Sequence, residues 1–329
     1  MMTSPDVSVV VCTYNRAELL RGALESLGKL QTGGRLRYEI VVVDNGSTDH
    51  TDRVVEEAIQ REEVPIRCIH EPRAGVACAR NCAVRLAAGT WIAFFDDDQL
   101  AEPDWLLALV ATAERTGARY VGGAVRLALP ETVLSELPPL CRRLLGESVA
   151  VAAPCKLHRK LGVGTGNLLI HRTVFDQIGP FDESLRAAGE DTDLTRRVRA
   201  AGIEGWFNPS AVVRHVVPTY RLQDDYFRWT SVRNGTHLAH RERQRWGRIG
   251  FPPVLAARAA QVMLRYVPRW LWAHVTRSRK IRLEGRCQLW RAEGYFRLVL
   301  GWAAPSWLAR SDFASQIDFR TERELFAPK

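Results

Sequence analysis

Short apolar runs alternate with amphipathic segments along the first hundred residues of the chain. Residues 7–13, 39–43, 65–69 and 90–95 are mostly apolar. The first of these runs is rich in β-branched residues, which is typical of a strand covered on both faces. The intervening segments place apolar residues three and four positions apart, beginning at Leu19 in the first of them. This order of short strands and helices of about ten to fifteen residues predicts a parallel, doubly wound α/β sheet.

The pattern is less regular beyond residue 101. Residues 120–127, a run that starts at Leu168, and residues 212–216 predict further strands, and residues 191–201 predict a helix. Residues 129–160 give no clear assignment. After residue 216 the chain predicts mostly helix. In a parallel sheet, ligands bind where the loops gather at the carboxyl ends of the strands, so we expect the polar loops TYNR, DNGSTD and DDDQ to meet in one crevice.

Charge is unevenly distributed along the chain. Residues 1–213 hold 24 Lys and Arg against 28 Asp and Glu, whereas residues 214–329 hold 22 against 9 and also seven of the ten Trp residues. This asymmetry predicts a C-terminal region with its own partner, either nucleic acid or an anionic membrane surface. The sequence has no run of about 18 apolar residues, so it predicts no membrane-spanning helix. The first apolar run is too short for a secretory signal. We therefore expect a cytoplasmic protein with reduced cysteines.

Three consecutive carboxylates, Asp96, Asp97 and Asp98, follow the run at residues 90–95. Adjacent ionised carboxylates repel one another, and their charge is costly beside an apolar wall unless it is compensated. Divalent cations with oxygen ligands, Mg²⁺ or Mn²⁺, supply that compensation and leave coordination sites for substrate phosphates. The alternative is a solvated acidic turn before the helix predicted near Pro103.

Four segments in order resemble the motifs of inverting glycosyltransferases of family 2: VSVVVCTYNRAELL, EIVVVDNGSTDHT, EPRAGVACARNCAVRLAAGTWIAFFDDDQ and GEDTDLTRRVRAAG. The resemblance covers about residues 7–216 and implies a GT-A fold, an α/β mixed sheet flanked by helices. It implies a catalytic domain at residues 1–216, with a nucleotide-sugar half at about 1–100 and an acceptor half at about 101–216. Residues 217–329 would form a basic, mostly helical region.

The resemblance also implies roles for single residues. Asp98 would hold the divalent cation and His215 would meet the metal or the diphosphate, although a lone His is more often a packing residue. Gln99 stands where many relatives carry Asp, which changes the outer metal shell. The residues expected around the nucleotide sugar are Thr13, Tyr14, Arg16, Asp44, Arg80, Asn81, Asp96 and Asp97; Asp44 could instead cap its own turn.

Glu190 and Asp191 match the catalytic pair of the family, whose aspartate is the usual general base. Inversion needs one carboxylate at the acceptor hydroxyl, because the hydroxyl attacks the anomeric carbon as the diphosphate leaves on the opposite face. The alternative is that the Asp191 carboxylate only stabilises the helix, because a negative charge is favourable at the positive, N-terminal end of the helix dipole. Gly166 and Asn167 are expected on the acceptor side.

Three functions compete at this point. The glycosyltransferase would use a nucleotide-diphosphate sugar, a glycan or lipid-linked acceptor, and Mg²⁺ or Mn²⁺. A sugar-phosphate nucleotidyltransferase would need a glycine-rich first loop, which VCTYNRAE lacks. A nucleic-acid-binding protein would explain the basic tail, but the predicted crevice is acidic, so we expect no nucleic acid partner. The Arg- and Trp-rich tail fits peripheral attachment to the cytoplasmic face of a membrane, or packing against the catalytic domain.

Overall fold

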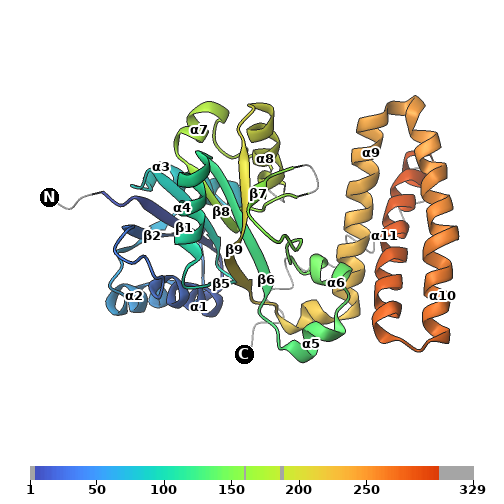
Figure 1. Ribbon diagram of the computed structural model, residues 1–329, viewed down its shortest axis with the longest axis horizontal. Helices are drawn as coiled ribbons and strands as arrows, with labels where there is room; N and C mark the ends of the chain where they lie inside the picture. Colours follow the sequence, from blue (N-terminus) through green and yellow to red (C-terminus); the bar gives the residue numbers. More distant parts are fainter. Residues whose placement is uncertain (1–3, 159–160, 186–188, 304–329) are drawn as a thin grey trace. The chain divides into compact units, whose positions relative to one another are not determined.

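The computed structural model describes residues 4–158, 161–185 and 189–303 (Figure 1). The chain divides into two compact units. The first unit comprises Met1–Ala128 and Glu147–Val216, and the second comprises Leu129–Gly146 and Val217–Lys329. Residues 304–329, the last part of the predicted basic region, lie outside the described residues. The domain boundary expected at residue 216 stays a prediction, and residues 129–146 fall into the second compact unit.

The first unit is built on a mixed sheet of nine strands within its described residues, ordered β3-β2-β1-β4-β8-β6-β9-β5, with β7 paired to β9. Strands β1 to β4 are mutually parallel where they pair, but β8 runs antiparallel between β4 and β6. The all-parallel sheet predicted from periodicity is therefore wrong, and the mixed GT-A sheet is confirmed. The strands are β1 Val7–Thr13, β2 Tyr38–Asp44, β3 Ile66–His70, β4 Trp91–Asp96, β5 Gln99–Ala101, β6 Tyr120–Leu127, β7 Cys155–Lys156, β8 Asn167–His171 and β9 Gly205–His215.

Helices cover both faces of this sheet, and alternate strand residues pack against them. Val9 and Val11 of β1 belong to the core under α1 (Ala17–Gly28), α2 (Thr51–Arg61) and α4 (Trp105–Thr116). Val10 faces the opposite core, which lies under α3 (Val76–Leu86), α7 (Thr173–Ile178) and α8 (Glu190–Ala200). Successive side chains of a strand point to opposite faces. A fully apolar run such as residues 9–11 therefore fits a strand that is buried on both sides.

The carboxyl ends of β1, β2 and β4 meet at one edge of the sheet. Thr13 is paired with Asp44, and Cys12 is paired with Asp96. Strand β5 then returns antiparallel to β9, which places Gln99 opposite His215, the last residue of β9. The predicted polar loops therefore gather along this edge.

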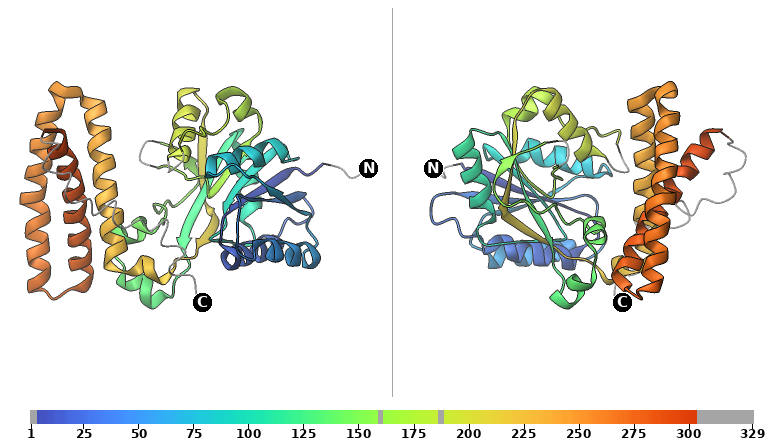
Figure 2. Two further views of the ribbon diagram at one scale, coloured as in Figure 1. Left: turned by 180° about the vertical axis from the view of Figure 1, so that it is seen from behind. Right: turned by 45° about the vertical axis from the view of Figure 1, so that its right-hand side comes forward.

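The second unit is mostly helical among its described residues, as the sequence of the C-terminal region predicted. Its elements are α5 Glu131–Glu136, α6 Pro139–Leu144, a 3₁₀ turn Thr219–Leu222, α9 Asp224–Gln261, a π-helical turn Val262–Tyr266, α10 Val267–Val275 and α11 Arg279–Ala303. Helix α9 is interrupted at Gly247, whose backbone is not helical. Helix α11 packs against both α9 and the shorter α10 (Figure 2).

Two glycines allow the close approach of α9 and α11. A Cβ atom on Gly235 would lie 2.0 Å from the carbonyl oxygen of Arg291, and one on Gly294 would lie 2.0 Å from that of Val232. Larger residues at either position would therefore separate the two helices. Within the described residues, no helix combines the length and apolarity needed to cross a membrane.

Candidate functional site

The aspartate triplet at the end of β4 is held partly by the first loop. Asp97 accepts a hydrogen bond from Thr13 Oγ1 at 2.9 Å and another from Arg16 Nη1 at 2.6 Å. The same Arg16 nitrogen lies 3.2 Å from Asp98 Oδ2. Although burial alone would lower the pKa of Arg16, Asp97 and Asp98 raise it above its ordinary value. One guanidinium therefore offsets the charge of two of the three carboxylates, and the structure brings these four predicted residues together.

Arg80 links the third aspartate to the catalytic pair. Its guanidinium donates to Glu190 Oε1 at 2.7 Å and lies 3.6 Å from Asp96 Oδ1, and its side chain is 9% exposed. Removal from water raises the pKa of Asp96 to about 6, with Asp98 and Asp97 adding to the rise and Arg80 opposing it. Glu190 Oε2 is buried and has no hydrogen-bond partner among the described residues. The predicted donor-side residue Arg80 therefore holds the first turn of α8 beside the aspartates.

Asp98 and His215 are brought together, as expected for two ligands of one cation. His215 Nε2 lies 3.5 Å from Asp98 Oδ2, and both side chains are nearly buried. A carboxylate oxygen and an imidazole nitrogen are donors that Mn²⁺ accepts, and carboxylates also suit Mg²⁺. The residues present therefore fit a divalent cation, although Arg16 occupies the same face of Asp98. Their role as ligands stays a prediction.

A second group of possible metal ligands was missed by sequence reasoning. Asp44, Asp52 and His70 offer ligand atoms that all lie within 4.8 Å of one another, the one such group found among the described residues. Asp44 is buried and accepts a hydrogen bond from the backbone N–H of Ser47 at 3.0 Å. Asp44 therefore also caps its own turn, which was the alternative role expected from the sequence. The group could have been found from the position of His70, which ends β3 beside Asp44 at the end of β2.

Asp191 lies in the first turn of α8 and faces a glycine-containing loop. Its Oδ1 accepts a hydrogen bond from the backbone of Thr192 at 2.5 Å, and its Oδ2 lies 4.0 Å from the position that a Cβ atom on Gly164 would occupy. A Cβ atom on Gly166 would lie 2.2 Å from Asp96 Oδ2. The loop containing these glycines therefore passes close to both carboxylates, and a side chain on Gly166 would displace Asp96.

Two predicted site residues use their side chains within the fold. Asn167 is buried, donates to the carbonyls of Ala124 and Ala211, and accepts a hydrogen bond from Trp105 Nε1. Asn81 accepts from the backbone of Phe181 and donates to that residue's carbonyl. These contacts give both amides a structural role. The expected roles of Asn81 on the donor side and Asn167 on the acceptor side stay predictions.

Tyr14 contrasts with these two residues, because its side chain is half exposed at the first loop. A ring in that position is accessible to a ligand along the carboxyl edge. It is the predicted donor-side residue with the most open surroundings.

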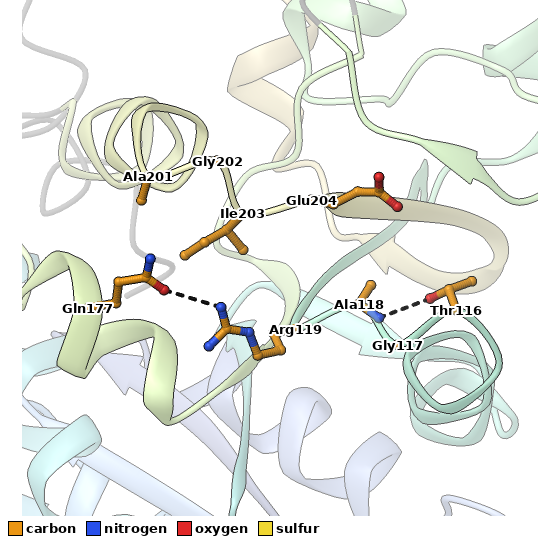
Figure 3. Close-up of a pocket in the computed structure, with 9 residues that line it drawn as sticks. All are labelled: Thr116, Gly117, Ala118, Arg119, Gln177, Ala201, Gly202, Ile203 and Glu204. Atoms are coloured by element: carbon orange, nitrogen blue, oxygen red, sulfur yellow. Dashed lines mark hydrogen bonds between the residues drawn. The ribbon is translucent and has the colours of Figure 1, made fainter.

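The first unit has another hollow, away from this edge (Figure 3). It encloses about 170 Å³ where β6 and β9 begin, and Arg119 in it is held by Gln177 at 3.1 Å. Strands β6 and β9 are parallel, so the hollow lies at the amino ends of the strands rather than at the carboxyl ends. It contains none of the predicted site residues.

Comparison with known proteins gives a family and a fold. The family model described as "Glycosyl transferase family 2" matches residues 8–178. The succinoglycan biosynthesis protein ExoM of Rhizobium meliloti is 32% identical over 252 residues, which are 73% of this chain and 78% of that protein. Glycosyltransferase AglE of Haloferax volcanii is 30% identical over 202 residues, 61% of this chain and 63% of that protein.

Solved structures of two other proteins share the fold. The mannosyltransferase PcManGT from Pyrobaculum calidifontis, solved with GDP-Man and Mn²⁺, has a TM-score of 0.54 and 20% identity, covering 98% of this chain and 81% of that one. GalNAc-T7, solved with UDP, GalNAc and Mn²⁺, has a TM-score of 0.50 and 19% identity, covering 66% and 45%.

Proposed function

The chain belongs to glycosyl transferase family 2 and is a glycosyltransferase, and we propose that it moves one sugar with inversion from a nucleotide-diphosphate sugar to an acceptor hydroxyl. The relative ExoM, named as a succinoglycan biosynthesis protein, supports a role in making a cell-surface glycan or glycolipid. The observation that carries the proposal is the set of carboxylates joined by Arg80, which contacts both Asp96 and Glu190, the residue that precedes Asp191 in the first turn of α8.

Asp191 acts as the general base in this proposal. Its carboxylate takes the proton of the acceptor hydroxyl while that oxygen attacks the anomeric carbon, a contribution of about 10²–10⁴-fold to the rate. Glu190 does not need to react, because its ion pair with Arg80 fixes the start of α8 and so the position of Asp191. The glycine loop leaves room for the acceptor beside Asp191.

The donor nucleotide would lie along the carboxyl ends of β1, β2 and β4. Asp44 can accept hydrogen bonds from a base or a ribose, and the exposed Tyr14 ring offers an apolar face nearby in the first loop. Thr13 and Arg16 hold Asp97 in place. The GDP-Man bound to PcManGT and the UDP and GalNAc bound to GalNAc-T7 support a donor of this class.

Asp98 and His215 would hold a Mg²⁺ or Mn²⁺ ion. When bound, such an ion neutralises the charge of the diphosphate leaving group. The 3.5 Å separation of the two side chains and the Mn²⁺ in both structural neighbours support this assignment. The group formed by Asp44, Asp52 and His70 is the competing location.

We also propose that the second unit attaches the enzyme to the cytoplasmic face of an anionic membrane. The chain has ten Lys and Arg but no Asp or Glu between Glu242 and Glu284. Large apolar side chains are exposed over the same stretch. Exposed apolar side chains among an excess of cations favour anionic lipid, even though Arg258 and Arg269 are paired with Glu242 and Glu284. Such binding would bring a lipid-linked acceptor to the enzyme. The exposed apolar residues are Trp246, Ile249, Met263, Leu264, Leu271, Trp272 and Val275.

Mass spectrometry of reactions with a panel of sugar nucleotides, each offered with soluble and lipid-linked acceptors, tests the proposed activity. We expect one donor to yield an acceptor heavier by one sugar, and NMR of that product to give the anomeric configuration opposite to that of the donor. Asp191→Asn should lower turnover by about 10²-fold or more with donor affinity within a few fold.

Asp176→Asn is the matched control for that variant, because Asp176 is an exposed carboxylate on α7. It should act like the wild type. Retention of configuration would refute the one-step mechanism. Loss of donor binding in Asp191→Asn without loss of turnover would move Asp191 to the donor pocket.

A further inference from the structure

The second unit contains a cavity of about 270 Å³ between α6, α9 and α11. Among the described residues, no acidic side chain lines it. Three guanidinium groups contribute to it, two from the long helices α9 and α11 and one from the short helix α6. The polar residues that line this arginine cavity are Arg143, Ser231, Asn234, Arg241, Cys287 and Arg291.

Arg291 is a partly buried cation at the wall of this cavity. Its Nε is buried and has no hydrogen-bond partner among the described residues. Burial lowers the pKa of Arg291, and the neighbouring charges of Arg258 and Arg241 lower it further. Tyr266 and Glu242 oppose this effect, but the carboxylate of Glu242 already accepts hydrogen bonds from Arg258 and Tyr295. A partly buried cation in this position is costly unless an anion joins it.

A second buried polar group at the cavity also lacks a partner. The hydroxyl of Ser231 is buried and makes no hydrogen bond with the described residues. The Cys287 thiol is close enough for the hydroxyl to affect its pKa, yet a thiol is a weak partner for a hydroxyl. Most buried polar atoms in proteins are hydrogen-bonded. The hydroxyl and the Arg291 Nε–H therefore both provide unused hydrogen-bonding capacity at the cavity.

We propose that the arginine cavity binds a phosphate or diphosphate group. Guanidinium groups bind phosphate oxygens in pairs through parallel hydrogen bonds, and Arg143 and Arg241 are exposed and accessible from solvent. The volume is just below the range of about 300–1,000 Å³ that is usual for small-molecule sites, which suits a compact anion. The donor diphosphate is proposed to bind in the first unit, so this would be a separate anion site.

Calorimetry of the full chain with inorganic pyrophosphate tests the proposal. A chelator in a chloride buffer removes metal-dependent binding in the catalytic crevice. We expect saturable binding by the wild type that is at least about tenfold weaker in the Arg143→Gln/Arg241→Gln double variant, because each lost guanidinium removes charge-assisted hydrogen bonds. Both residues are exposed, so the double variant should keep its circular dichroism spectrum and melting temperature.

Arg248→Gln is the matched control, because Arg248 is exposed on α9 and does not line the cavity. It should bind pyrophosphate as the wild type does. Absence of saturable binding to the wild type, or equal affinity in the double variant and the control, would overturn the proposal.

The anion could come from a lipid headgroup or from free phosphate, and farnesyl diphosphate distinguishes the two. Binding at least tenfold tighter than that of pyrophosphate, and lost in the double variant, would indicate a lipid-borne diphosphate. Equal affinity for both compounds would reject the lipid source and assign the site to free anions.

Discussion

Replacing Arg80 by Met should destabilise the first unit strongly. The substitution keeps the length and apolar stem of the side chain but removes the guanidinium that lies 2.7 Å from Glu190 and 3.6 Å from Asp96. Side chains of Arg80 and Glu190 are only 9% and 10% exposed, and the second oxygen of Glu190 already has no hydrogen-bond partner among the described residues. Water therefore cannot readily replace the lost partner.

The size of the effect follows from this burial. Removing one member of a buried ion pair costs about 3–5 kcal/mol, because the other charge stays buried without compensation. A protein is typically stable by about 5–15 kcal/mol in total. Arg80→Met should therefore remove a large share of the stability, and Arg80→Met/Glu190→Gln should recover part of it by removing the uncompensated charge.

Urea denaturation of the single and double variants measures these free energies as a double-mutant cycle. Arg85→Met is the control on the same helix, because Arg85 is 56% exposed and lies 3.7 Å from Glu71; it should cost less than about 1 kcal/mol. If Arg80→Met costs no more than Arg85→Met, or if the cycle gives no coupling, the inference that Arg80 stabilises the buried acids is wrong.

Three further outcomes are expected. A chelator should abolish transfer and Mg²⁺ or Mn²⁺ should restore it, whereas Asp98→Asn should stay inactive after the metal is returned; full activity of that variant would exclude the assignment. The wild type should sediment with anionic but not with neutral vesicles, and less of it should sediment at high salt. Leu271→Gln/Trp272→Gln should lose this binding; unchanged sedimentation would show that these apolar side chains do not attach the protein to the membrane. The hydrogen bond from Arg73 lowers the pKa of Glu71 to about 2. The ionised Glu71 therefore stabilises the folded protein above pH 4.5, and this contribution to the free energy of unfolding is lost as the pH falls towards 2. The urea midpoint of Glu71→Gln should fall less on acidification than that of the wild type.

The sequence predicted the first strands well because they are buried on both faces, so their apolar runs are nearly uninterrupted. It could not predict the direction of β8, since the five residues NLLIH read the same way in a parallel or an antiparallel strand. The last strand was predicted only from residue 212, but β9 begins at Gly205. Asn208, Pro209 and Ser210 interrupt its apolar pattern, and the pairing with β6 shifts register beside them.

The candidate site shows a similar limit. Carboxylates that end a strand are visible as a local pattern, so the sequence singled out Asp96 and its two neighbours. The ion pair of Arg80 with Glu190 joins residues 110 positions apart, and His70 meets Asp44 across 26 positions. Such contacts depend on strand order, and no single segment of the chain contains the information that fixes that order.

The division of the chain between its two compact units has a consequence for how relatives could exchange parts. The second unit is assembled from two stretches, because Leu129–Gly146 belongs to it as well as Val217–Lys329. Cys141 in the first stretch is fully buried and its sulfur lies 3.7 Å from that of Cys287 in the second. A single recombination event near residue 216 would join a hairpin from one parent to helices from another. Evolutionary exchange of the helical unit, or the construction of a chimera, would therefore have to transfer both stretches together or re-create the fit around this cysteine pair.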